Sequence, residues 1–234
     1  MRLGRWELAD GARAWIELEA DHGHRLDAPP WLGGRRTGER VTQGTAIAPV
    51  APSKIVCIGR NYRAHAAELG NEVPAEPLLF LKPPSAILGP GGAIELPPQS
   101  QRVEHEVELG VVVGAPLRRA SEAQAREAIW GYTIVADITA RDLQRSDGQW
   151  TRAKGFDTFC PVGPVVVRGL DAAALDITCT VSGVVRQRGS TADMVFGPAA
   201  LLAYISQVMT LEPGDLVSTG TPEGVGPLKS GDNV

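Results

Sequence analysis

Acidic residues alternate along the apolar segment 103–113 in a pattern that could bind a metal ion. Successive side chains of a strand point to opposite faces, so Glu104, Glu106 and Glu108 are predicted to share one face. The valines that follow indicate that this strand runs into the interior, where neighbouring carboxylates repel one another unless a cation neutralises them. Oxygen ligands favour a hard ion such as Mg²⁺, Mn²⁺ or Ca²⁺ over zinc. The alternative is a solvent-facing strand side with acidic residues and no ligand.

A third carboxylate lies where another apolar strand, residues 132–137, opens into a loop. Asp137 ends this segment, and together with Glu106 and Glu108 it would make a three-carboxylate site with positions left for water and substrate. Asp142 is the rival ligand, although it could equally begin a helix or pair with Arg141.

His65 and Glu68 form a second candidate group. On a helix these residues are three apart and lie on one face. A carboxylate that is hydrogen-bonded to one imidazole nitrogen fixes the tautomer and raises the basicity of the other nitrogen, which suits water activation. The alternative is a solvated pair on a surface helix.

Two further features could contact an anionic substrate. Lys154 stands between Ala153 and Gly155 with aromatic residues nearby, and could point into a pocket rather than into solvent. The turn 218–224 is rich in Gly and Thr, and could aim N–H groups and hydroxyls at a carboxylate. The same turn composition is also common without any ligand.

The elements that must position these residues are mostly strands. Apolar segments separated by scattered Gly (27) and Pro (18) predict a β-rich α+β protein with a few covering helices. Residues 1–50 are predicted to form a small N-terminal β-rich piece, in which no chemistry is evident, and residues 51–234 a catalytic domain. The expected helices span 62–69, 121–130, with a capping box at Ser121 and Gln124, and 198–209. The expected strands span 54–58, 77–81, 105–113, 132–137, 162–167, 175–182 and 215–219.

Composition excludes several functional classes. The 234 residues carry a net charge of -4, with no basic run, so no nucleic acid partner is expected. Apolar runs are far shorter than the ~20 residues of a membrane-spanning helix, and the N-terminus lacks a signal peptide. The three cysteines, Cys57, Cys160 and Cys179, are widely spaced, which predicts buried reduced thiols in a cytoplasmic protein.

Six segments, taken in order, resemble the fumarylacetoacetate hydrolase superfamily. The resemblance covers about residues 53–234, and the matching segments are 59–62, 79–83, 105–109, 137–142, 154–157 and 219–226. It implies a mixed β-sandwich roll, usually a homodimer. The family pattern leads into a further strand after residue 234, so we expect either a truncated chain or a last strand beyond this sequence.

The resemblance also implies roles for particular residues. Mg²⁺ or Mn²⁺ would be held by Glu106, Glu108 and Asp137. His65 and Glu68 would activate water from a lid segment, and Lys154 would stabilise negative charge on the substrate. The residues implied to line the substrate pocket are Arg60, Asn61, Lys82, Arg141, Gln144 and Thr221.

The reaction expected from this resemblance is carbon–carbon bond hydrolysis of an acylpyruvate or a similar 1,3-dicarbonyl or 2-oxo acid through a metal-stabilised enolate. The alternative is a 2-hydroxyhepta-2,4-diene-1,7-dioate isomerase or an oxaloacetate-type decarboxylase with the same enolate chemistry. A more remote alternative is a non-catalytic protein that binds 2-oxo acids.

Overall fold

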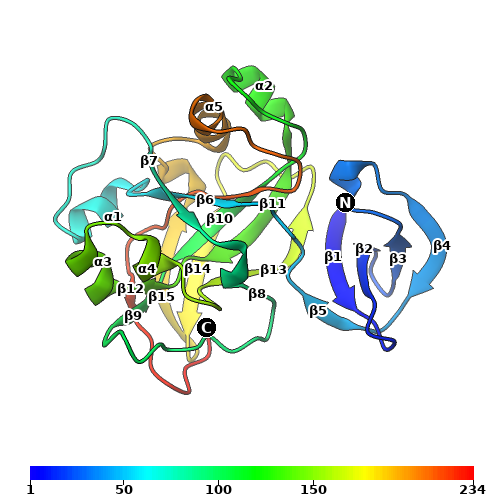
Figure 1. The fold of residues 1–234 in the computed structure, drawn as a ribbon, viewed down its shortest axis with the longest axis horizontal. Helices are drawn as coiled ribbons and strands as arrows, with labels where there is room; N and C mark the ends of the chain where they lie inside the picture. The colour runs from blue at the N-terminus through cyan, green and yellow to red at the C-terminus, as the bar shows by residue number, and fades with distance from the viewer.

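Strands dominate the computed structural model, which describes all residues from 1 to 234, and five short α-helices accompany them (Figure 1). The N-terminal strands are β1 (Arg2–Glu7), β2 (Arg13–Leu18), β3 (Gly23–Leu26), β4 (Arg36–Val41) and β5 (Thr45–Ile47). The remaining strands are β6 (Ile55–Gly59), β7 (Leu78–Lys82), β8 (Ile87–Leu88), β9 (Val103–His105), β10 (Val107–Val113), β11 (Ile129–Ala136), β12 (Thr139–Ala140), β13 (Cys160–Val167), β14 (Asp176–Val181), β15 (Val184–Ser190), β16 (Leu216–Ser218) and β17 (Gly226–Pro227). The helices are α1 (Arg63–Glu68), α2 (Glu122–Glu127), α3 (Arg141–Asp147), α4 (Thr151–Lys154) and α5 (Pro198–Val208), with 3₁₀ turns at Pro30–Leu32, Pro84–Ala86 and Thr191–Asp193. The prediction of a β-rich α+β protein is confirmed.

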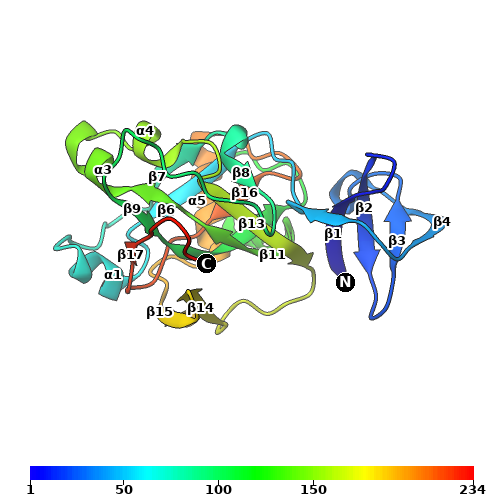
Figure 2. The same ribbon diagram turned by 90° about the horizontal axis from the view of Figure 1, so that it is seen from below.

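One long mixed sheet runs through the molecule in the order β4-β3-β2-β1-β13-β11-β10-β16-β6-β7. Strand β5 adds to β1, and β8 adds to β13. The N-terminal strands extend to one side of the molecule (Figures 1 and 2), and β1 joins them to the rest of the sheet through β13. A small sheet of β12, β9 and β17 and the hairpin β14–β15 complete the strands.

Helices α2 and α5 lie together against one part of the sheet (Figure 1). The apolar residues Leu201, Leu202 and Ile205 of α5 pack with Val56 and Val111 in a buried cluster. The capping box is confirmed, because Ser121 Oγ accepts from the Gln124 N–H while Gln124 Oε1 accepts from the Ser121 N–H. The predicted helix 121–130 was too long, since the chain already enters β11 at Ile129.

The predicted strand 105–113 is in fact divided at Glu106. Strand β9 pairs with β12 and β17, whereas β10 pairs with β11 and β16. The carbonyl of Glu106 accepts a hydrogen bond of 2.8 Å from the Asp137 N–H at the same point. This change of partner places two predicted metal ligands side by side.

Helices α3 and α4, which follow β12, were not predicted. Their short polar segments lack the apolar periodicity that identifies a helix in sequence.

No helix in the structure is both long enough and apolar enough to cross a membrane.

Candidate metal centre and active site

Three carboxylates converge at the point where β9, β10 and β11 meet. Glu106 lies between β9 and β10, Glu108 lies on β10, and Asp137 follows β11. One oxygen of each lies within 4.8 Å of the others. All three side chains are buried, with at most 4% of any residue exposed. The structure therefore brings together the three residues predicted as metal ligands.

Glu108 is held by neutral donors alone. Its Oε2 accepts from the Ser218 hydroxyl at 2.6 Å and from the Gly220 N–H at 2.7 Å. Burial, followed by the nearby charge of Asp137, raises the pKa of Glu108 to about 8. Gly220 has a φ of +98°, and a Cβ there would lie 2.7 Å from the Cβ of Asn61, so this turn requires glycine.

Two buried lysines approach the other two carboxylates. Lys154 Nζ lies 2.9 Å from Glu106 Oε2 and 2.5 Å from Asp137 Oδ2. Lys82 Nζ lies 2.5 Å from Asp137 Oδ1 and donates to the carbonyl of Ile138 at 3.0 Å. Burial lowers the pKa of Lys154, but the charges of Asp137 and Glu106 outweigh it and leave this pKa above its usual value. Lys154 therefore stays charged.

Arg141, at the start of α3, bridges two acids of the broken strand. Its Nε donates to Glu104 Oε2 at 2.7 Å, its Nη2 donates to Glu106 Oε1, and its Nη1 donates to Gln144 Oε1 at 2.5 Å. Burial favours the neutral form of Glu106, but Lys154 and Arg141 together hold its pKa below the usual range. Glu104, which was predicted to share a face with Glu106, is thus an ion-pair partner of Arg141 and lies outside the carboxylate cluster.

The donor set fits a hard divalent cation. The four buried acids Glu104, Glu106, Glu108 and Asp137 face only three buried cations, Lys82, Arg141 and Lys154. Glu108 is the carboxylate left without a positive partner, and an uncompensated buried charge is costly. All the converging ligand atoms are oxygens, which suit Mg²⁺ or Mn²⁺. The rival ligand Asp142 is a helix-start acid instead, and it accepts from Ser100 Oγ and from the backbone at Gln101 and Leu143.

His65 and Glu68 lie on α1 in the predicted arrangement. His65 Nδ1 is 3.4 Å from Glu68 Oε2, and the Glu68 carboxylate also accepts from the Gly224 N–H at 3.0 Å. His65 is only 5% exposed. If Nδ1 carries its proton toward Glu68, the lone pair on Nε2 is left to act as a base.

One pocket is lined by the His65 imidazole together with two of the three carboxylates, Glu106 and Glu108. Its lining residues are Ile58, Gly59, Arg60, His65, Leu69, Asn71, Phe80, Glu106, Glu108, Arg141, Gln144, Trp150, Lys154 and Thr221. Arg60 differs from the other cations at this pocket, because its side chain makes no hydrogen bond or ion pair within the chain. Its backbone has a φ of 57°, a left-handed conformation that is uncommon outside glycine and recurs at functional sites.

Two residues predicted to contact substrate, Asn61 and Thr221, also hold the site together through hydrogen bonds within the chain. The Asn61 amide donates to the carbonyls of Thr219 and Phe196 and accepts from the Phe196 N–H, so it fastens the turn after β16. The Thr221 hydroxyl donates to the carbonyl of Val107 and accepts from Gln187 Nε2 at 2.7 Å.

Sequence reasoning missed Gln187 and Ser218. Gln187, on β15, accepts from the Val107 N–H at 2.9 Å and so supports the chain beside the break at Glu106. A buried glutamine 80 residues away has no local signal. Ser218 is the last residue of β16 and the first of the segment 218–224, and its position where the strand opens into this turn was the available signal.

The three thiols lie in the interior, unpaired, as predicted. Burial raises the pKa of Cys160 to about 12 and moves the other two in the same direction. A nucleophilic role for cysteine therefore has no support.

Residues 54–234 match the family model described as fumarylacetoacetate (FAA) hydrolase C-terminal. The mitochondrial oxaloacetate tautomerase of Arabidopsis thaliana is 48% identical over 188 residues, which cover 78% of this chain and 84% of that protein. The mitochondrial oxaloacetate decarboxylase of Dictyostelium discoideum is 46% identical, over 76% of this chain and 85% of that protein. The crystal structure of a 2-hydroxyhepta-2,4-diene-1,7-dioate isomerase from Mycobacterium marinum superimposes with a TM-score of 0.89 at 45% identity, over 99% of this chain and 91% of that chain.

Proposed function

This chain belongs to the fumarylacetoacetate hydrolase family, and we propose that it is a divalent-metal-dependent enzyme that interconverts the keto and enol forms of a 2-oxo dicarboxylate such as oxaloacetate. The observation that carries this proposal is the unpaired Arg60 in the pocket that is also lined by His65 and by Glu106 and Glu108 of the carboxylate cluster.

Arg60 supports a substrate with two carboxylates. Arg141 and Lys154 already neutralise acids of the protein, whereas the guanidinium of Arg60 has no partner in the chain. Guanidinium groups bind carboxylates with two parallel hydrogen bonds. A dicarboxylic 2-oxo acid could place one end at the carboxylate cluster and its second carboxylate at Arg60, which an acylpyruvate with an apolar acyl group could not do.

The protein groups can support the proton transfers of such a reaction. His65 Nε2 would remove a proton from the carbon beside the ketone, and the electron pair of that C–H bond becomes the carbon–carbon double bond while the ketone oxygen gains negative charge. The charged Lys154 ammonium would stabilise the negative charge on that oxygen. Solvent would supply the proton that completes the enol and would accept the proton from His65. A divalent cation at the carboxylate cluster would supply Lewis-acid stabilisation of negative charge on oxygen.

Carbon–carbon bond hydrolysis, the reaction first expected from the sequence, is the second candidate. The contact between His65 and Glu68 favours it, because the same base could deprotonate water instead of carbon. Access of water to the pocket would then decide the outcome.

The test is the fate of oxaloacetate and acetylpyruvate with the purified protein. We expect metal-dependent equilibration of the enol and keto forms of oxaloacetate in the ultraviolet spectrum, loss of this activity in EDTA, and a KM for oxaloacetate raised at least tenfold in Arg60→Gln, about 1.4 kcal/mol of binding. Controls without enzyme are required because both compounds enolise in solution. Release of acetate from acetylpyruvate, with no acceleration of oxaloacetate enolisation, would refute the tautomerase and support the hydrolase.

The homodimer implied by the family and the cytoplasmic location remain predictions. Sedimentation of the purified chain would test the first, and subcellular fractionation the second.

A further inference from the structure

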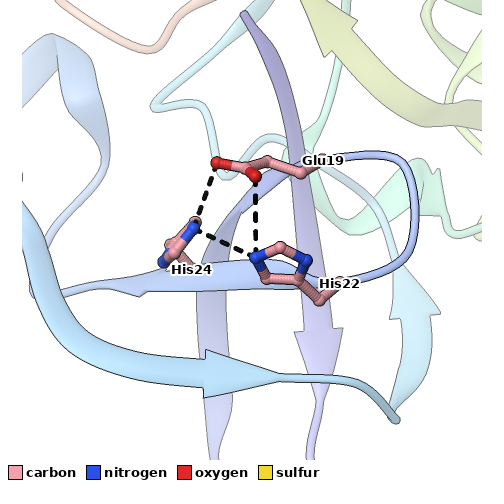
Figure 3. Close-up of side chains that lie close together, drawn as sticks. All are labelled: Glu19, His22 and His24. Atoms are coloured by element: carbon pink, nitrogen blue, oxygen red, sulfur yellow. Dashed lines mark hydrogen bonds and ion pairs between the residues drawn. The ribbon is translucent and has the colours of Figure 1, made fainter.

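Three side chains of types that bind metal ions, Glu19, His22 and His24, cluster at the turn between β2 and β3, in the region where the sequence offered no chemistry. Strands β2 and β3 form a hairpin in which Leu18 pairs with Gly23 and Glu17 pairs with His24. The Glu19 N–H donates to the carbonyl of His22 at 2.8 Å, which closes the turn. Glu19, His22 and His24 consequently share one face and point toward one another (Figure 3).

The spacing of these atoms suits a four-coordinate zinc ion. His22 Nε2 lies 3.3 Å from His24 Nε2 and 3.6 Å from Glu19 Oε2, and His24 Nε2 lies 3.1 Å from Glu19 Oε1. Bonds of about 2.0–2.1 Å in a tetrahedron place neighbouring ligand atoms about 3.3 Å apart. The two imidazoles are largely shielded, with 12% and 15% of their side chains exposed.

A neighbouring carboxylate orients one of the two imidazoles. Asp21 Oδ1 lies 2.7 Å from His22 Nδ1, within hydrogen-bond distance. The contact keeps the proton on Nδ1 and directs the lone pair of Nε2 toward His24 and Glu19. Histidine ligands of metal ions commonly donate their second ring N–H to a carboxylate in this way.

We propose that Glu19, His22 and His24 form a second metal site, distinct from the buried carboxylate cluster and selective for Zn²⁺ or a similar transition-metal ion. Two imidazoles and one carboxylate favour zinc, nickel or copper, whereas the all-oxygen cluster at Glu106, Glu108 and Asp137 favours Mg²⁺ or Mn²⁺. The ion would link the two strands of the hairpin across its turn and leave a fourth position to water.

Arg36 and a proton are the competitors for these ligands. Arg36 Nη2 lies 3.1 Å from Glu19 Oε1 and its Nε lies 2.7 Å from Glu17 Oε2. A shared proton could also connect the two imidazole nitrogens with no metal bound. Arg36 has Glu17 as a second partner, so binding of an ion by Glu19 would not leave the guanidinium unpaired.

Counting bound Zn²⁺ separates these alternatives. Metal-free full-length protein is dialysed against buffered Zn²⁺, and bound metal is measured by mass spectrometry for wild type, His22→Gln/His24→Gln and Arg36→Gln. We expect the double histidine variant to lose one equivalent relative to wild type, and Arg36→Gln, a matched change on the same face, to keep it. Equal stoichiometry in wild type and the double variant would overturn the proposal.

Co²⁺ provides a second readout that does not depend on the double variant. Four-coordinate Co²⁺ with nitrogen ligands absorbs visible light far more strongly than six-coordinate Co²⁺ with oxygen ligands. We expect this strong absorption in wild type and its loss in the single variant Glu19→Gln, with unchanged far-ultraviolet circular dichroism. Its absence in wild type would also overturn the proposal.

Discussion

Replacement of Glu108 by glutamine should stabilise the metal-free protein, by an amount that grows with pH. Burial and the charge of Asp137 raise the pKa of Glu108 from 4.5 to about 8. A group whose pKa is raised in the folded state contributes its full stability below its unfolded pKa and loses it as the pH rises through the folded pKa. The wild-type protein therefore loses stability as the pH rises from 4.5 to 8. At about 1.4 kcal/mol per pKa unit, the loss in its free energy of unfolding approaches roughly 4–5 kcal/mol at pH 8.

Glutamine is a suitable probe because its amide oxygen can still accept from the Ser218 hydroxyl and the Gly220 N–H. The measurement is urea unfolding in EDTA at several pH values, with the free energy of unfolding compared between variant and wild type. The difference should be small near pH 5 and reach several kcal/mol above pH 8. A difference independent of pH would refute the reasoning.

Glu104→Gln is the matched control, and we expect it to destabilise the metal-free protein. Glu104 is a buried acid of the same chain segment, but it is paired with Arg141 at 2.7 Å and with Arg102 at 2.5 Å. Its neutralisation leaves Arg141 short of a partner, so the metal-free protein should lose about 3 kcal/mol of stability. Stabilisation by Glu104→Gln would contradict a stabilising ion pair between Glu104 and Arg141.

Three further substitutions test the remaining roles. Asp137→Asn should abolish Mn²⁺ binding, and retained affinity in a calorimetric titration would remove Asp137 from the ligand set. His65→Gln should lower kcat by about 10²–10⁴-fold while Mn²⁺ affinity is kept, and an unchanged kcat would exclude His65 as the base. Lys154→Met should lower kcat and also destabilise the metal-free protein by about 3–5 kcal/mol, because Glu106 and Asp137 lose a buried partner; denaturant unfolding with no loss would contradict the ion pairs.

The sequence was informative where chemistry depends on local spacing. Strand alternation placed Glu106 and Glu108 on one face, and helical spacing paired His65 with Glu68. Asp137 was predicted as a third ligand only because it ends an apolar strand. These relations involve residues a few positions apart or a simple strand end, so local periodicity was sufficient to predict them.

Long-range relations could not be predicted in the same way. The break at Glu106 arises because β9 and β10 pair with different strands, and nothing within residues 103–113 encodes that change of partner. Gln187 supports the break from β15, far along the chain. The group Glu19, His22 and His24 at the β2–β3 turn was missed for a different reason. It depends on the register of a hairpin whose turn residues, Ala20 and Asp21, carry no strong turn signal.

The charges around the carboxylate cluster indicate how metal binding and folding are related. Buried acids without partners would each cost several kcal/mol, yet Lys82, Lys154 and Arg141 pair with all the acids except Glu108. Protonation of Glu108, whose pKa is raised to about 8, removes the remaining charge at neutral pH. The protein should therefore fold without metal, and binding of a divalent ion should release a proton from Glu108. Calorimetric titration with Mg²⁺ near pH 7 in buffers of different ionisation enthalpy would measure that proton, and a binding enthalpy that is the same in every buffer would contradict this account.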